Sequence, residues 1–263
     1  MSIRFDSVSK SFGAKKILFD FSFEARPGEI LFILGKSGMG KSVTLKHIVG
    51  LLKPDRGRVH VDGQDITELD EEGLARIRRL CGMVFQHPAL LDSLSIFDNV
   101  AFGLKRLGLS PEETSLRVTE TLDLVHLGPD VLRRFPSELS YGMQKRVSLA
   151  RTLAPGPSAL LFDEPTTGLD PITTTAINEL ILTLSRKLQV TSLVVSHDMG
   201  SALKIADRIL VLDQGRILAL GTPAEIEASP LELIREFLEE TLEQRRGRSG
   251  PDQDPDRDEE NGK

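Results

Sequence analysis

The sequence has little of the material from which disulfide bonds, membrane spans and export signals are made. Its 263 residues include one cysteine, Cys81, so no internal disulfide can form and we expect a small buried side chain there. No apolar run approaches the ~18 residues that a membrane-spanning helix needs. The first residues, Met1–Asp6, lack the charged-then-apolar order of an export signal. We therefore expect a soluble, cytosolic chain, and any membrane-spanning part of its system must be another polypeptide.

An excess of positive charge is also missing. The 33 lysines and arginines are outnumbered by 39 aspartates and glutamates, which gives a net charge of -6 and a pI near 5.5. Because a general basic surface is the usual basis of nucleic-acid binding, we expect no nucleic-acid partner. The remaining composition is ordinary for a globular protein, with 40% hydrophobic and 27% charged residues in a chain long enough to bury a sizeable core.

A glycine-rich stretch, Gly35–Ser42, carries the most specific chemistry in the sequence. It reads Gly-Lys-Ser-Gly-Met-Gly-Lys-Ser and stands between the strand-like run 30–34 and the helix-like segment 43–49. Its glycines let backbone N–H groups turn toward an anion, while Lys41 and Ser42 are spaced to meet nucleotide phosphates and their Mg²⁺. A turn that merely joins a strand to a helix would need neither side chain at these offsets. The residues expected at the phosphates are Gly35, Lys36, Ser37, Gly38, Met39, Gly40, Lys41, Ser42 and Val43.

A second signal is an apolar strand that ends in two carboxylates, Asp163 and Glu164. The carboxyl ends of strands line the ligand crevice of a parallel sheet, so Asp163 can reach the Mg²⁺ on the side opposite Ser42. Glu164 can then polarise the water that attacks the γ-phosphate. Exposed strand ends often carry acids, and the signal becomes strong because it lies downstream of a phosphate-binding loop.

Four further features extend this site, although each has a simpler interpretation when taken alone. Gln86 follows a strand-like segment and could bridge the metal and a helical block, or could be a solvated loop residue. Ser140 and Gly142 begin a helix whose N-terminus would suit a second phosphate contact, while Ser140 alone is an ordinary N-cap. His197 follows an apolar strand and could contact the γ-phosphate and the water, although a lone histidine is usually structural. Asp170 lies on a loop that could carry a carboxylate to a neighbouring subunit.

Short apolar strands alternate with longer helical patterns along the chain, which is typical of an α/β fold with a mostly parallel sheet. The first 30 residues instead look antiparallel, with strands at 3–5 and 17–23, and residues 59–64 indicate a hairpin. Residues 88–155 show helical patterns only, which predicts an inserted helical subdomain. The strands expected after it are 159–162, 191–195 and 209–212, and the helices are 172–187, 200–206 and 231–242.

These patterns divide the chain into four predicted parts. The core takes residues 1–87 and 156–230, and the helical subdomain takes residues 88–155. A C-terminal helix of residues 231–243 follows. Residues 244–263 contain almost nothing apolar, so we expect them to form a disordered acidic tail.

Taken in order, these motifs resemble those of the nucleotide-binding subunits of ABC (ATP-binding cassette) transporters, over residues 1–243. The resemblance implies a P-loop NTPase (RecA-like) core with an N-terminal antiparallel β subdomain and an inserted helical subdomain. It implies ATP and Mg²⁺ as ligands and places Phe12 where the family stacks an aromatic ring on adenine, although Phe12 could be an ordinary core aromatic. In the family's terms the functional residues would be Gly35–Ser42 as Walker A, Gln86 as the Q-loop, Leu139–Met143 as the signature, Asp163 and Glu164 as Walker B, Asp170 as the D-loop and His197 as the switch histidine. Glu164, His197 and Gln86 would be catalytic, and Ser42, Gln86 and Asp163 would bind the metal.

The family resemblance also implies how such a chain would work with partners. Two cassettes would pair head to tail, so that each ATP lies between Walker A of one copy and the signature of the other. Integral membrane permease subunits would hold the pair at the cytoplasmic face of the inner (plasma) membrane. The signature departs from the common Leu-Ser-Gly-Gly-Gln at Tyr141 and Met143, and Tyr141 adopts positive φ less readily than glycine.

A finer resemblance concerns the transported substrate. Residues 85–102, together with Met143 and residues 170–173, look like ATPases of the Mla and Mce lipid-transport systems, although His87-Pro88 departs from the small residues expected there. This implies transport of phospholipids or other lipids, with a lipid-binding periplasmic component of Mce type as a further partner. The alternatives are the ATPase subunit of an amino-acid or other small-solute importer and a soluble, non-transport ABC ATPase. A P-loop kinase or GTPase would explain neither the signature-like segment nor His197.

Overall fold

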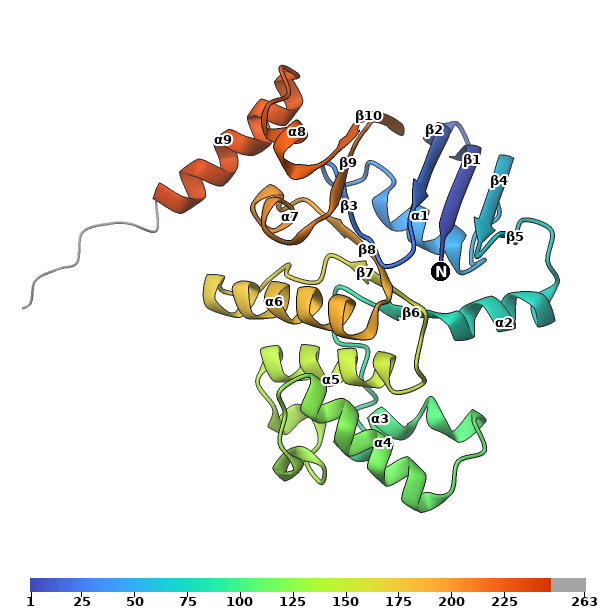
Figure 1. Cartoon of the computed structure of the whole chain (residues 1–263), viewed down its shortest axis with the longest axis vertical. Helices are drawn as coiled ribbons and strands as arrows, with labels where there is room; N and C mark the ends of the chain where they lie inside the picture. Colours follow the sequence, from blue (N-terminus) through green and yellow to red (C-terminus); the bar gives the residue numbers. More distant parts are fainter. Residues whose placement is uncertain (247–263) are drawn as a thin grey trace, which may run out of the picture.

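The computed structural model describes residues 1–246 and contains two β-sheets (Figure 1). The larger sheet has six strands in the order β10-β9-β3-β8-β7-β6, and every neighbouring pair is parallel except β10 with β9. Within the described residues, no helix has both the length and the apolarity needed to cross a membrane. The strands of this sheet are β3 (Ile30–Leu34), β6 (Cys81–Val84), β7 (Ala159–Asp163), β8 (Thr191–Ser196), β9 (Arg208–Asp213) and β10 (Arg216–Gly221).

The central strands of this sheet are covered on both faces, which explains their nearly continuous apolar sequences. Successive side chains of a strand point to opposite faces, so Ile30, Phe32 and Leu34 join one hydrophobic core while Leu31 and Ile33 join the other. Residues of α5 (Tyr141–Leu153), α6 (Pro171–Leu188) and α7 (Met199–Ile205) fill the first core. Residues of α1 (Lys41–Ile48), α2 (Glu71–Leu80) and the smaller sheet fill the second.

The smaller sheet is antiparallel and confirms the predicted N-terminal β subdomain. Its strands, in the order β2-β1-β4-β5, are β1 (Ile3–Phe12), β2 (Lys15–Ala25), β4 (Arg56–Val61) and β5 (Gln64–Asp65). Two residues with positive φ, Asp62 at 51° and Gly63 at 78°, form the predicted hairpin turn between β4 and β5. Three phenylalanines, Phe5, Phe21 and Phe23, pack together in the second core with ring centroids 4.8 to 5.8 Å apart, one pair stacked and two edge to face.

The segment between β6 and β7 is helical, which confirms the predicted helical insertion. Ser110 caps its longest helix through a hydrogen bond from the backbone N–H of Glu113, whose side chain accepts from the Ser110 N–H in return. The same segment ends on α5, whose N-cap is Ser140. Its helices before α5 are α3 (Ile96–Ala101), η1 (Leu104–Arg106), α4 (Pro111–Leu124), η2 (Pro129–Val131) and η3 (Pro136–Glu138).

Several details differ from the sequence-based expectations. The pattern missed α2, β10 and the short α8 (Pro223–Glu227), and β6 ends at Val84 rather than at Phe85, which is exposed. The last helix, α9, spans Glu232–Arg246, so residues 244–246 are helical and not part of a tail. Glutamate, glutamine and arginine are good helix formers, which lets the helix continue past its last apolar residue. The remainder of the predicted tail, residues 247–263, lies outside the described residues.

Candidate active site

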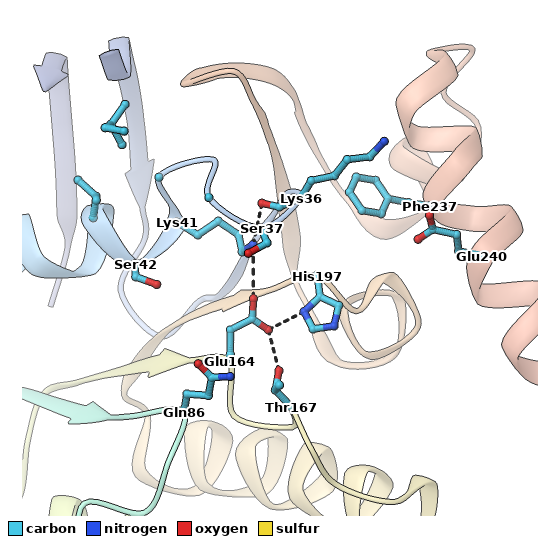
Figure 2. Close-up of a pocket in the computed structure, with 14 residues that line it drawn as sticks. Lys36, Ser37, Lys41, Ser42, Gln86, Glu164, Thr167, His197, Phe237 and Glu240 are labelled. Carbon is cyan, nitrogen blue, oxygen red and sulfur yellow. Dashed lines mark hydrogen bonds and ion pairs between the residues drawn. The ribbon is translucent and has the colours of Figure 1, made fainter. Parts of the chain in front are cut away.

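A cavity of about 600 Å³ opens at the carboxyl end of β3 and contains most of the predicted site (Figure 2). Its floor is the loop between β3 and α1, and its sides come from the ends of β6, β7 and β8 and from α9. The residues that line it are Ile17, Lys36, Ser37, Gly38, Gly40, Lys41, Ser42, Val43, Gln86, Glu164, Thr167, His197, Phe237 and Glu240.

The loop at the cavity floor depends on its glycines. Gly40 has a φ of 100°, and a Cβ there would lie 3.0 Å from the side chain and carbonyl of Ile17. A Cβ on Gly35 would lie 2.5 Å from the carbonyl oxygen of Leu212. Neither position could therefore carry a side chain without moving a neighbouring strand. The loop brings the N-terminus of α1 into the cavity, where backbone N–H groups favour an anion.

Lys41 is buried, and its ammonium contacts both the loop and the carboxylate of Glu164. It donates to the carbonyl oxygens of Gly35 at 2.6 Å and Lys36 at 3.2 Å, and it lies 3.4 Å from Oε1 of Glu164. A buried ammonium beside backbone N–H groups is suited to the oxygens of a polyphosphate. Lys41 therefore lies between the anion-binding loop and the residue proposed to activate water.

The residues expected to hold Mg²⁺ supply oxygen atoms at adjoining positions. The hydroxyl of Ser42, at the start of α1, donates to Oδ1 of Asp163, at the end of β7, over 2.7 Å. Gln86 follows β6 and lines the same cavity (Figure 2). Hydroxyl, carboxylate and amide oxygens are hard ligands, and Mg²⁺ is commonly bound by one or two carboxylates together with substrate phosphates. The donor set therefore fits Mg²⁺ accompanying a nucleotide.

Glu164 is the centre of a side-chain network. Its Oε2 accepts from Thr167 Oγ1 at 3.0 Å and contacts Nδ1 of His197 at 2.8 Å (Figure 2). Its backbone has a φ of 49°, which a non-glycine residue seldom adopts, and its N–H donates to the carbonyl of Val195. Burial raises the pKa of Glu164, but the hydrogen bond and charge of His197, with Lys41 and Thr167, outweigh burial and leave that pKa below its ordinary value. Glu164 is therefore held as a carboxylate, the form that can accept a proton from water.

His197 is the more exposed partner of this pair. It follows β8, and 58% of its side chain is accessible to solvent. The hydrogen bond to Glu164 raises the pKa of His197, against the opposing effect of burial, and the charge of Glu164 acts in the same direction. The histidine thus orients the carboxylate while keeping one side open to the cavity.

The remaining predicted site residues lie apart from this cavity or have other partners. Phe12 is 49% exposed at the end of β1, and the ammonium of Lys10 lies 5.7 Å from the centre of its ring, while Ile17 lines the cavity. Met39 packs against the second core. The adenine contact of Phe12 and the phosphate contact of Met39 stay predictions.

The signature and D-loop residues cap helices within the single chain. Ser140 accepts from the N–H of Met143 at 3.3 Å, and Gly142 lies in the first turn of α5. Tyr141 is helical there, so the signature segment does not require a positive φ from it. Asp170 caps α6 by accepting from the N–H groups of Ile172 and Thr173, and the hydroxyl of Thr173 lowers the pKa of its carboxyl group most. The roles proposed for Ser140, Gly142 and Asp170 toward a second copy stay predictions.

Sequence reasoning missed one complete side of the cavity. Phe237 and Glu240 of α9 line it (Figure 2). Glu236, on the same helix, forms an ion pair with Lys36 at 2.9 Å. The ion pair is the main cause that raises the pKa of Lys36. The amphipathic pattern of residues 231–242 predicts the helix but gives no sign of what its faces meet. Thr167, three residues after Glu164, could have been identified as a neighbour of that carboxylate.

The family model described as ABC transporter matches residues 18–167. The cavity of this chain has the phosphate loop, paired carboxylates and histidine that such a cassette uses. The chain therefore belongs to the ABC transporter family, and its cavity is suited to ATP with Mg²⁺ as the accompanying ion.

Known proteins extend this comparison. The chain is 40% identical over 240 residues to the methionine import ATP-binding protein MetN of Brucella abortus, a match that covers 91% of this chain and 65% of the relative. It is 38% identical to the probable ribonucleotide transport ATP-binding protein mkl of Mycobacterium leprae, over 90% of this chain and 69% of the relative. The ATP-binding cassette MJ0796, solved as a dimer in a post-hydrolysis state bound to ADP and Pi, is 33% identical with a TM-score of 0.77, over 84% of this chain and 98% of that one. The chain thus spans less than two thirds of the length of the MetN relative.

Proposed function

We propose that this chain is the ATP-hydrolysing subunit of an ABC importer for a small solute, with an amino acid such as methionine as the substrate class. The observation that carries the substrate class is the 40% identity to a protein named for methionine import, over 91% of the chain. The set of motifs in the cavity is common to transport ATPases of this kind and does not distinguish their substrates. The small-solute alternative therefore has more support than the lipid assignment expected from residues 85–102.

In the proposed hydrolysis, each side chain of the cavity has a defined task. The loop N–H groups and Lys41 bind the β- and γ-phosphates, while Ser42, Asp163 and Gln86 would hold Mg²⁺, which would supply positive charge beside the phosphates. Glu164 accepts a proton from the attacking water, and His197 and Thr167 fix the direction of its carboxylate. Lys41, now 3.4 Å from Glu164, would be shared between that carboxylate and the bound phosphates.

We propose that the functional unit contains two copies of this chain and membrane partners. Ser140, Gly142 and Asp170 do not line the cavity of their own chain, which is consistent with their acting on the ATP of a second copy. The dimeric MJ0796 cassette provides a related precedent for pairing. In this proposal, permease subunits hold the pair at the cytoplasmic face of the inner membrane.

Lipid transport is a second candidate because of one sequence observation. Residues 85–102, Met143 and residues 170–173 resemble lipid-transport ATPases of the Mla and Mce type. In that case the partners would include a lipid-binding periplasmic component. Of these residues, Gln86 lines the cavity, and the others lie in the loop after β6, in the helical segment, in the first turn of α5 and at the start of α6.

The two candidates can be separated in the source organism by replacing the native gene with a Glu164→Gln version. If the chain serves an amino-acid importer, initial uptake of labelled methionine should fall to the level of a gene deletion, while the distribution of labelled phospholipid between membranes stays unchanged. The opposite pattern would support lipid transport. Loss of neither activity would contradict both assignments, and a Glu179→Gln version, which changes an exposed glutamate of α6, controls for the loss of a carboxylate.

A further inference from the structure

Lys145 is a buried cation for which the motif assignments give no role. It lies on α5, and 6% of its side chain surface is exposed. The groups around its ammonium are neutral, namely two backbone carbonyls and the ring of Tyr141, whose centre lies 5.5 Å away. Burial lowers the pKa of Lys145 to about 8. Burying an ammonium away from a carboxylate costs free energy, which indicates that this side chain has a structural or functional role here.

The two carbonyls belong to segments far apart in the sequence. Nζ of Lys145 donates to the carbonyl oxygen of Gln86 at 2.9 Å and to that of Pro165 at 2.7 Å. Gln86 lines the nucleotide cavity, and Pro165 directly follows Glu164. One ammonium therefore connects α5, whose N-cap is the signature residue Ser140, with the loop after β6 and the turn after β7.

A second contact supports the loop at Gln86. The hydroxyl of Tyr141 lies 3.5 Å from the same Gln86 carbonyl and 3.2 Å from Nδ1 of His87. Lys145 also lines a small, mainly apolar pocket together with Phe85, Phe162 and Ile177. The direction of its ammonium is set by the two carbonyls.

The backbone at Glu164 needs support from both sides. Its φ of 49° is a conformation that costs free energy in a non-glycine residue and persists where the surroundings hold it. On one side the Glu164 N–H donates to the Val195 carbonyl of β8. On the other side the next carbonyl, that of Pro165, accepts from Lys145. A change at Lys145 would therefore release the turn that carries the catalytic carboxylate.

We propose that Lys145 is a positioning residue for ATP hydrolysis, which holds the Glu164 turn and the Gln86 loop in a fixed relation to the signature helix α5. It does not line the nucleotide cavity itself. This inference rests on the proposed hydrolysis of ATP at this cavity. It states that one side chain, Lys145, sets the position of the Glu164 carboxylate relative to the signature helix α5.

The test is ATP hydrolysis by the purified full chain carrying Lys145→Met, which keeps the length and removes the ammonium. Because small displacements of a catalytic group lower rates strongly, kcat should fall at least about tenfold while the KM for ATP changes less than about twofold. Lys145→Arg keeps N–H donors and should retain more activity than Lys145→Met. Lys187→Met, at an exposed lysine of α6, is the matched control and should leave kcat unchanged.

Rates are expressed per ATP-binding site, titrated with labelled nucleotide, so that a partly unfolded sample does not imitate a catalytic defect. Lys145→Gln, shorter but still a donor, is measured alongside and should lower kcat in the same direction. The proposal is overturned if both neutral variants keep kcat per site within about twofold of the unmodified chain, or if Lys187→Met falls as far. If the unmodified chain itself fails to hydrolyse ATP, the proposed function fails instead.

Discussion

The two sides of the nucleotide cavity differ in how the sequence encodes them. One side is the loop from Gly35 to Gly40 with the start of α1, contiguous in the chain and recognisable from its spacing alone. The other side is α9, whose Phe237 and Glu240 reach the cavity from about two hundred residues away (Figure 2). The first side attracts anions, whereas the second brings carboxylates toward them. The comparison shows that a motif in the loop can identify the site in the sequence, while the net charge around the cavity also depends on residues of α9.

The largest effect is expected at Glu164, which lies against the loop side. Glu164→Gln keeps the shape but removes the base, so kcat should fall by on the order of 10² or more while ATP binding persists. Steady-state hydrolysis and equilibrium binding of labelled ATP measure the two quantities. Glu179→Gln is the control, and normal turnover by Glu164→Gln would remove Glu164 from the mechanism.

The next effect is on nucleotide affinity. Lys41→Ala removes a charged hydrogen-bond donor from the phosphates, a loss of about 1.5–3 kcal/mol that corresponds to roughly 10- to 100-fold weaker ATP binding. Calorimetry of the purified chain measures the dissociation constant. Lys46→Ala, an exposed lysine on the same helix, should bind like the unmodified chain. Tight binding by Lys41→Ala would show that the loop does not hold the phosphates through this residue.

On the α9 side of the cavity, a substitution is expected to strengthen ATP binding. Glu240→Gln removes a negative charge from the cavity lining, so ATP should bind roughly two- to fivefold more tightly at low salt, with a smaller difference at high salt. Glu239→Gln makes the same charge change at the neighbouring exposed position and should have less effect. Weaker ATP binding by Glu240→Gln, measured by the same calorimetry, would mean that α9 contributes a favourable contact instead.

The smallest effect concerns the pH dependence of stability through His197 and Glu164. The raised pKa of His197 gives a contribution that is complete below the ordinary value of 6.5 and is lost as pH rises through the folded-state pKa. The lowered pKa of Glu164 gives a contribution that is present above 4.5 and is lost as pH falls through its folded-state pKa. The pair therefore stabilises the chain most between about pH 4.5 and 6.5.

His197→Gln tests this window. The Tm of the unmodified chain should exceed that of the variant near pH 5.5, by less than about 3 °C because the histidine is largely exposed. The difference in Tm should be smaller at pH 8.5. A gap that grows from pH 5.5 to pH 8.5 would contradict the assigned pairing. His126→Gln, at an exposed turn of the helical segment, serves as the control.

Sequence reasoning succeeded where a functional residue directly follows the strand that positions it. The strands β3, β7 and β8 were predicted because continuous apolar runs indicate strands buried on both faces. Since parallel strands end at the same edge, Lys41, Glu164 and His197 were expected near one another, and they are. The strand β10 was missed, as an edge strand has a mixed pattern of exposed and half-buried residues.

Other features could not be predicted because they depend on contacts between distant segments. Nothing local to Lys145 indicates that its ammonium would meet the carbonyls of Gln86 and Pro165. Likewise, Asp170 reads as a free carboxylate until the structure shows it accepting from the first turn of α6. The substrate class was expected from the resemblance of residues 85–102 to lipid-transport ATPases, whereas the comparison over nearly the whole chain gives more support to a small solute.

The sequence by itself determined the anion-binding loop, because its glycines, Lys41 and Ser42 are contiguous in the chain and stand at the offsets that a phosphate-binding backbone needs. The apolar runs in the sequence also determined the parallel strands, and Glu164 follows one of them at the edge of the sheet where those strands end. The tertiary structure alone decided that α9 lines the cavity with Phe237 and Glu240 and pairs Glu236 with Lys36, and that a buried lysine fixes the turn at Glu164. Such contacts form when whole helices and strands pack against one another. The residues involved are far apart in the sequence, so no local sequence pattern predicts them.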